Sequence, residues 1–372
     1  MQLVIYMFKR ISIFFLYPFA VVFALVFCAL KLYDLPVLGK QNAEKMLGQQ
    51  PIINFDTPEV ISFFSAPSMR TEPEFFDFTD SPQSFSEEFV LPLPEGGKTE
   101  DKTAPQTFFP VKAVSMIPKD SSGYIIYKNV FISNKSTKTF DVDKIMSRDV
   151  TFKVTKASKG PQVLIVHTHA TEAFRTPDTQ TYEKKDEMRN TDNTQNVVAV
   201  GRVLKEGLEQ NGIKTLQCET QHDNPDYTGA YKKSLDSINY YLKQYPTIKV
   251  VIDLHRDTII NDENIKYQPL ASIDGRNAAQ MMIIVGTGTK AVSNPHYNNN
   301  LRFATQFQNR IEEKYPALCR PLLIKDNPYN MQASSGGMLI EMGSCGNTLE
   351  ESKYTAELIA PVLAQLIASK IK

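Results

Sequence analysis

The chain has 372 residues, equal numbers of acidic and basic residues (41 each) and only four cysteines. A net charge of zero, without a basic stripe interleaved with aromatic residues, argues against a nucleic-acid-binding protein. The cysteines (Cys28, Cys218, Cys319 and Cys345) form no CxxC pair and no framework spacing. They argue against a disulfide scaffold and against a cysteine-rich zinc knuckle.

The N-terminal segment has the composition of a membrane anchor. Residues 11–30 are 20 consecutive uncharged, mostly apolar residues, with Lys9 and Arg10 before them and Lys31 after. This is the length of a membrane-spanning helix, and no A-x-A cleavage site follows it. We therefore expect residues 1–33 to form a short cytoplasmic tail and a single-pass anchor, with the rest of the chain outside the cell. A cleaved signal peptide is the alternative.

Residues 34–110 differ from the rest of the chain in composition. Pro, Ser and Phe recur without a period, and between Asp34 and Glu100 there are 12 acidic and four basic residues. This predicts an irregular acidic spacer, whose Phe-rich pieces are either solvated or docked on a partner. Residues 111–154 contain short β-favouring runs and are expected to form a small β-rich lead-in.

From residue 155 to residue 372, apolar runs alternate with amphipathic segments of helical length. Unbroken β-favouring runs predict buried strands at residues 163–166, 215–218, 249–257, 281–285 and 337–343. Apolar spacing and terminal signals predict helices over residues 195–210, 230–244, 301–313 and 350–371. The alternation predicts an α/β domain with a mostly parallel sheet and helices on both faces.

Three of the predicted strands end in side chains that can bind a metal. The first runs into His167, His169 and Glu172, the second carries His255, and the third carries Glu341. Open α/β sheets place their chemistry at the carboxyl ends of strands. An HxxE pair, a distant histidine and a later glutamate provide a His₂Glu metal set and one general base, which suits zinc best.

Each of these residues also has a purely structural interpretation. A single HxxE arises often by chance, and His255 could be a core histidine or form an ion pair with Asp253 or Asp257. Glu341 is harder to explain in this way, because a carboxylate in an apolar run is costly to bury without a cation or a proton. The combination therefore favours a metal site.

Three runs carry a resemblance to a known family: VHTHATEAF at 166–174, DLHRD at 253–257 and LIEMGSCGNTLEE at 339–351. Together with the N-terminal anchor and the spacer, these runs resemble stage II sporulation protein P, a membrane-anchored cell-wall hydrolase of endospore-forming bacteria. More distantly, the layout is similar to zinc-dependent N-acetylmuramoyl-L-alanine amidases and to zinc carboxypeptidases.

The resemblance implies three zinc ligands and one general base, in chain order His169, Glu172, His255 and Glu341. His167 could replace His169 as the ligand. Amidases of this type usually carry their ligand glutamate at the start of the first helix after the first histidine, and residues 193–196 offer none. The carboxypeptidase-like position of Glu172 is therefore expected.

The resemblance also implies a substrate and a reaction. The substrate would be peptidoglycan, cleaved at the amide between N-acetylmuramic acid and L-alanine, and also at stem-peptide cross-links, during engulfment in sporulation. Arg256 is expected to help stabilise the developing oxyanion, unless it pairs with Asp253 or Asp257. Other sporulation cell-wall proteins would be the partners. The alternatives are a carboxypeptidase-like peptidase and a catalytically inactive scaffold that binds the cell wall.

Overall fold

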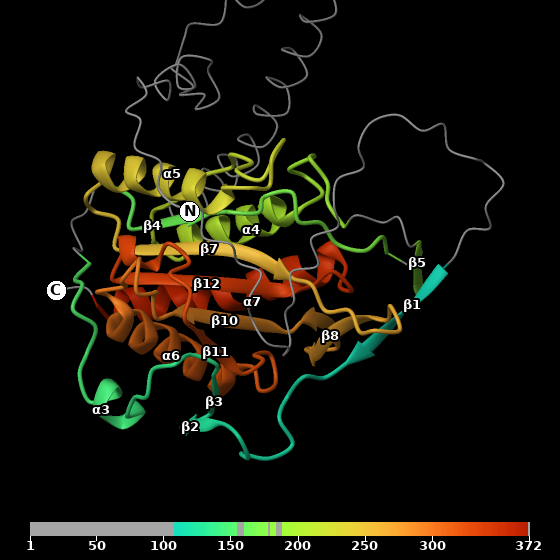
Figure 1. Ribbon diagram of the computed structural model, residues 1–372, viewed down its shortest axis with the longest axis horizontal. Helices are drawn as coiled ribbons and strands as arrows, with labels where there is room; N and C mark the ends of the chain where they lie inside the picture. Colours follow the sequence, from blue (N-terminus) through green and yellow to red (C-terminus); the bar gives the residue numbers. More distant parts are fainter. Residues whose placement is uncertain (1–107, 155–159, 178, 184–187, 371–372) are drawn as a thin grey trace, which may run out of the picture. The chain divides into compact units, whose positions relative to one another are not determined.

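The computed structural model describes residues 108–154, 160–177, 179–183 and 188–370 (Figure 1). The expected anchor at residues 1–33 and nearly all of the expected spacer lie outside the described residues. Within the described ranges, no helix is long and apolar enough to cross a membrane.

An eight-stranded sheet forms the centre of the domain (Figure 1). In spatial order its strands are β2 (Ile125–Tyr127), β3 (Val130–Asn134), β11 (Leu322–Lys325), β10 (Met281–Gly286), β12 (Gly336–Ser344), β7 (Val250–Asp257), β4 (Val163–Val166) and β6 (Thr215–Gln217). The strand β12 lies between β10 and β7, antiparallel to the first and parallel to the second. This arrangement places the ends of β4, β7 and β12 side by side.

A smaller sheet has the order β5 (Thr181–Glu183), β1 (Phe108–Val114), β8 (Lys266–Ile273) and β9 (Arg276–Ala279). Both sheets are mixed, so the expectation of a mostly parallel sheet was wrong. Two-residue turns join β2 to β3 and β8 to β9, and a turn that short can join only antiparallel strands. Asp274 and Gly275 both have positive φ, as the favoured two-residue hairpin turn requires.

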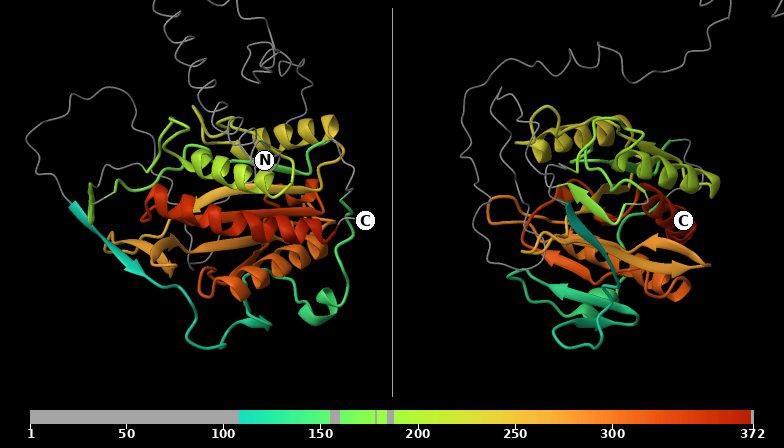
Figure 2. Two further views of the ribbon diagram at one scale, coloured as in Figure 1. Left: turned by 180° about the vertical axis from the view of Figure 1, so that it is seen from behind. Right: turned by 90° about the vertical axis from the view of Figure 1, so that its right-hand side faces the viewer.

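Helices cover both faces of the large sheet, as the sequence predicts. The helices α4 (Val197–Gln210), α6 (Tyr297–Lys314) and α7 (Leu349–Ala368) share one core with Val163 and Ile165 of β4. On the opposite face, α5 (Ala230–Gln244) packs through Ile238 against Leu164 and Val166. Seen from behind, α4 and α7 run side by side (Figure 2). Because successive strand residues point to opposite faces, the unbroken apolar run of β4 serves both cores.

Short helices and caps complete the domain. The helix α3 (Val142–Met146) and the 3-10 helix η1 (Met331–Ala333) lie in connecting segments. Asn196 caps α4 by accepting a hydrogen bond from the Val198 amide. The helix α7 begins with a capping box in which Thr348 and Glu351 satisfy each other's backbone amides. This cap fixes the chain directly after β12.

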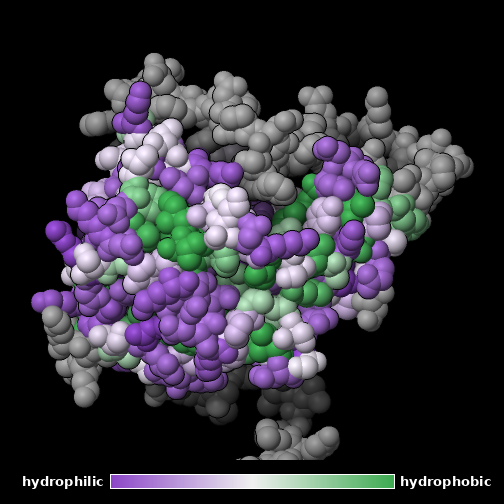
Figure 3. Space-filling view, turned by 90° about the horizontal axis from the view of Figure 1, so that it is seen from below, coloured by the Kyte–Doolittle hydropathy of each residue, from purple (hydrophilic) through white to green (hydrophobic). Residues whose placement is uncertain are grey.

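The surface carries only scattered apolar side chains in the described part of the chain. Seen from below, hydrophobic patches lie between larger areas of hydrophilic residues (Figure 3). The large hydrophobic side chains that are exposed come from separate elements: Phe108, Ile126, Tyr240 and Val292. Isolated residues of this kind are normal on a protein surface and need no functional explanation.

Candidate metal centre

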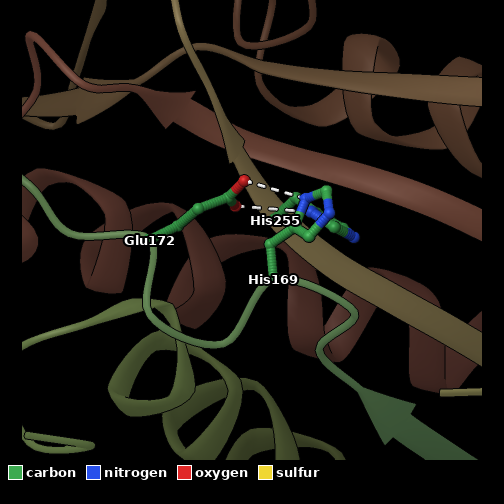
Figure 4. Close-up of side chains that lie close together, drawn as sticks. All are labelled: His169, Glu172 and His255. Atoms are coloured by element: carbon green, nitrogen blue, oxygen red, sulfur yellow. Dashed lines mark ion pairs between the residues drawn. The ribbon is translucent and has the colours of Figure 1, made fainter. Parts of the chain in front are cut away.

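Three of the predicted residues meet where β4 and β7 end. The strand β4 stops at Val166, and the turn-rich segment after it carries His169 and Glu172, whereas His255 lies on β7 (Figure 4). Each side chain is buried and offers one ligand atom, and these atoms all lie within 4.8 Å of one another. The structure therefore brings together the His–Glu–His group that the sequence predicts.

Glu172 faces both histidines. Its Oε1 lies 3.3 Å from Nδ1 of His169, and its Oε2 lies 3.3 Å from Nδ1 of His255. Two ligands that are each about 2.0–2.1 Å from a tetrahedral zinc ion stand roughly 3.3–3.4 Å apart. Two imidazole nitrogens and a carboxylate are also a donor set that zinc accepts. The 3.3 Å separations involve different oxygens of Glu172, and the three donor atoms all lie within 4.8 Å, a spacing and a donor set that one zinc ion can bridge.

The electrostatics of the group favour a positive charge. Burial opposes ionisation of Glu172, but His255, His169 and Arg256 hold its pKa well below the ordinary value. Burial also opposes protonation of His255, but the carboxylates of Asp253 and Glu172 raise its pKa well above the ordinary value. A proton on His255 supplies that charge when no cation is bound, and a metal ion would replace it.

Asp253 stands behind His255. Its Oδ1 lies 2.9 Å from Nε2 of His255, at ion-pair distance but without the alignment of a hydrogen bond. The same carboxylate accepts hydrogen bonds from the amide of Thr168 at 2.8 Å and from its hydroxyl at 2.6 Å. Asp253 therefore ties β7 to the segment that carries the other two donors. A carboxylate in this position orients an imidazole ligand.

A closed ring of contacts fixes His169. Tyr227 stacks on its imidazole with ring centroids 4.5 Å apart and an interplanar angle of 22°. The guanidinium of Arg189 lies 4.7 Å from the centre of the Tyr227 ring and pairs with Asp223 at 2.8 Å. Asp223 accepts a hydrogen bond from the hydroxyl of Thr171, two residues after His169. Sequence reasoning missed Tyr227, Arg189 and Asp223, because no local pattern joins these distant segments.

His167 does not belong to the group. Its Nδ1 lies 2.8 Å from the carbonyl oxygen of Leu254, and its Nε2 lies 3.0 Å from Nε2 of Gln217. Complete burial is the main reason that the pKa of His167 falls to about 4. It is a neutral, hydrogen-bonded core histidine, so of the two neighbouring histidines only His169 reaches the donor group.

Glu341 lies next to the group. It stands on β12 directly opposite His255 on β7. Its Oε2 is buried without a hydrogen-bond partner among the described residues. Burial, followed by repulsion from Asp257, raises the pKa of Glu341 to about 8, against the attraction of His255. A carboxyl group with one buried, unpartnered oxygen beside a metal-binding set is suited to proton transfer.

Arg256 is held by several hydrogen bonds near Glu172. Its guanidinium donates hydrogen bonds to the carbonyl oxygens of Ala173 and Met188 and to the hydroxyl of Thr258. Its backbone amide donates to Oε2 of Glu172 at 3.0 Å. Arg256 therefore supports the segment that carries Glu172. Among the described residues, no ion pair joins its guanidinium to Asp253 or Asp257, and an oxyanion role for this group stays a prediction.

Comparison with known proteins places these features in a family context. The sequence model of the family described as Stage II sporulation protein P matches residues 112–364. Stage II sporulation protein P of Bacillus subtilis (strain 168) is 27% identical over 222 residues, which are 55% of this chain and 50% of that protein. The match thus spans about half the length of that relative.

Solved structures of N-acetylmuramoyl-L-alanine amidases also align. Those from Clostridium difficile 630 and Nostoc punctiforme each have a TM-score of 0.32 and 14% sequence identity to this chain. Each alignment covers 57% of this chain, together with 97% of the first amidase and 98% of the second. The CwlD amidase from Clostridioides difficile, in complex with the GerS lipoprotein, has a TM-score of 0.33 and 12% identity, over 56% of this chain and 98% of its own.

Proposed function

Because this chain belongs to the stage II sporulation protein P family, we propose that it is a zinc-dependent peptidoglycan hydrolase of sporulation. The observation that carries this proposal is the buried group of His169, Glu172 and His255, whose 3.3 Å separations suit a single zinc ion. The bond cleaved is the amide between N-acetylmuramic acid and L-alanine, and stem-peptide cross-links are a second target.

The residues around the donor group have different roles in the proposed reaction. A zinc ion held there would supply a Lewis acid and lower the pKa of a bound water to about 7. Glu341 accepts a proton from the attacking water and returns it to the leaving amine, and its position opposite His255 supports this role. Asp253 orients His255, and Tyr227 orients His169. Positive charge in the group favours the ionised form of Glu341, as a base requires.

The location and the partners also belong to the proposal. We propose that residues 11–30 anchor the chain in the cell membrane with the hydrolase domain outside the cytoplasm, where peptidoglycan lies. Other sporulation cell-wall proteins would be its partners there. A reporter fused after residue 40 should be active only outside the cytoplasm, and recovery of soluble protein that begins near Lys31 would contradict the anchor.

Digestion of purified cell wall tests the reaction. The full-length protein in detergent, loaded with zinc, is incubated with peptidoglycan, and the products are identified by mass spectrometry. Release of intact stem peptides supports the amidase, and opened cross-links support the second activity. Shortened stems would indicate a carboxypeptidase instead. Unchanged peptidoglycan, with one zinc per chain and normal folding, would indicate an inactive scaffold.

A further inference from the structure

Two tyrosines extend the aromatic surroundings of His169 away from the donor group. Tyr231, in the first turn of α5, meets the His169 ring edge-on, with centroids 5.5 Å apart at 80°. Tyr329, between β11 and β12, has its ring centroid 6.0 Å from that of Tyr231, at 56°. Both tyrosines are partly exposed. They form a short uncharged row that starts at a candidate zinc ligand.

The surrounding structure holds this row in place. The side-chain amide of Asn330 donates hydrogen bonds to the carbonyl oxygen of Tyr231 at 2.8 Å and to the hydroxyl of Ser234 at 2.9 Å. One side chain thus ties the Tyr329 segment to α5. Tyr329 and Asn330 also have positive φ angles of 45° and 56°. An aromatic residue rarely adopts this conformation, which persists only where its surroundings impose it.

Core packing does not account for Tyr231. Tyr329 packs in part against the larger hydrophobic core, but Tyr231 belongs to neither core cluster among the described residues. A Cβ at Gly286 would first collide with the carbonyl oxygen of Asn327, and it would also stand 3.0 Å from Cδ2 of the Tyr329 ring. Glycine is therefore required beneath the segment that carries Tyr329, and this segment holds the tyrosine in a strained backbone conformation, which is typical of functional sites.

The chemistry of the row suits a sugar. A pyranose ring has an apolar face of C–H groups that packs against aromatic rings, and its hydroxyl rim can hydrogen-bond to phenol oxygens. The acidic stem peptide, in contrast, would be bound by cationic side chains. We propose, on the basis of the proposed function, that Tyr231 and Tyr329 form the subsite for the saccharide ring next to the scissile amide.

Two soluble probes that differ only in the sugar test this subsite. They are N-acetylmuramoyl-L-alanyl-D-isoglutamine and the same dipeptide with an N-lactyl group, which keeps the amide but lacks the sugar. Both are titrated calorimetrically into the zinc-loaded full chain carrying Glu341→Gln to prevent turnover. Tyr231→Ala and Tyr329→Ala should each weaken binding of the sugar-bearing probe by about threefold to tenfold. Binding of the sugar-free dipeptide should not change.

Conservative and control variants make the result specific. Tyr231→Phe and Tyr329→Phe keep the ring and should retain most of the affinity for the sugar-bearing probe. Tyr240→Ala removes an exposed tyrosine elsewhere on α5 and should change neither titration. Zinc content and thermal unfolding should match the parent protein in the phenylalanine variants, so that a lost fold cannot imitate a lost subsite.

Several results would overturn the subsite. Equal weakening of both probes would mean that the tyrosines bind peptide, and unchanged binding in folded, zinc-loaded alanine variants would mean that they bind neither. A parent protein that binds the sugar-bearing probe no better than the dipeptide would also contradict it. The proposed hydrolase is judged separately: sugar-specific loss in a chain that cleaves no cell wall would leave the subsite standing and refute the hydrolase.

Discussion

Nη1 of Arg320 lies 2.8 Å from Oδ2 of Asp257, and both side chains are buried. Asp257 ends β7 two residues after His255, whereas Arg320 precedes β11 on the other side of β10 and β12. The backbone amide of Arg320 also donates to the carbonyl oxygen of Met281. This pair supplies a counter-charge for the carboxylate whose repulsion contributes to the raised pKa of Glu341.

Loss of one partner should therefore cost more than loss of both. Arg320→Met leaves Asp257 as an unpaired buried charge, and we expect it to lower the free energy of unfolding by about 3–5 kcal/mol. Urea denaturation at pH 7 measures this change. The double variant Arg320→Met/Asp257→Asn should lose less than the sum of the single variants. Additive losses would show that the two side chains do not act as a pair.

Substitution of any one of the three donor residues should abolish metal binding. His169→Ala, Glu172→Ala and His255→Ala each remove one of three protein ligands, so each should lose zinc and cell-wall cleavage. Metal analysis of the purified variants measures occupancy. His167→Gln is the matched control: it disturbs two buried hydrogen bonds and should cost about 1–3 kcal/mol of stability while the zinc remains. Loss of zinc from a folded His167→Gln variant would contradict the assignment.

Glu341 should separate catalysis from metal binding. Glu341→Gln keeps the shape of the side chain but cannot accept a proton, so turnover should fall by roughly 10²-fold or more while the zinc stays. Rates of stem-peptide release and zinc content are measured on the same sample. If this variant loses zinc as completely as His169→Ala, Glu341 is a ligand and the base must be sought elsewhere, with Glu172 as the first candidate.

The raised pKa of Glu341 should make the free energy of unfolding of the metal-free protein depend on pH. The folded-state pKa of about 8 lies above the ordinary value of 4.5, so folding favours the protonated side chain. This stabilisation is complete below about pH 4.5 and is lost as the pH rises towards 8. Glu341→Gln, which is always neutral, should gain stability relative to the parent across this window. A difference that stays constant from pH 4.5 to 8 would argue against the shift.

Asp253 should control affinity without being a ligand. Asp253→Asn removes the negative charge behind His255 and weakens its orientation, so zinc affinity should fall by about 10–100-fold. Competition with a chelator of known affinity measures the change. Thr168→Val removes only one of the hydrogen bonds to Asp253 and should have a smaller effect. An unchanged affinity in Asp253→Asn would mean that the 2.9 Å contact does not influence the metal.

The sequence predicts which segments form strands and helices better than it predicts the direction of each strand in the sheet. Unbroken apolar runs identify the central strands, and the predicted helix at residues 230–244 has the bounds of α5. Short turns such as Asp274–Gly275 reverse the chain within the β-rich segments, so strand direction depends on local turn geometry that hydrophobic runs do not record.

The candidate site, like the fold, could be predicted only in part from the sequence. His169, Glu172, His255 and Glu341 stand in recognisable runs and could be predicted. The choice between His167 and His169 depends on where β4 ends, because beyond Val166 the backbone leaves the strand and side chains no longer alternate between two faces. Tyr227 and Asp223 come from segments that the fold alone brings to the site.

The position of β12 has a consequence for folding of the chain during its synthesis. This strand follows every other described strand in sequence, yet it lies inside the sheet, between β10 and β7. A nascent chain without it has two open strand edges, which favour aggregation, and it lacks Glu341. The proposed hydrolytic site would therefore be complete only after residue 344 has emerged and the sheet has closed.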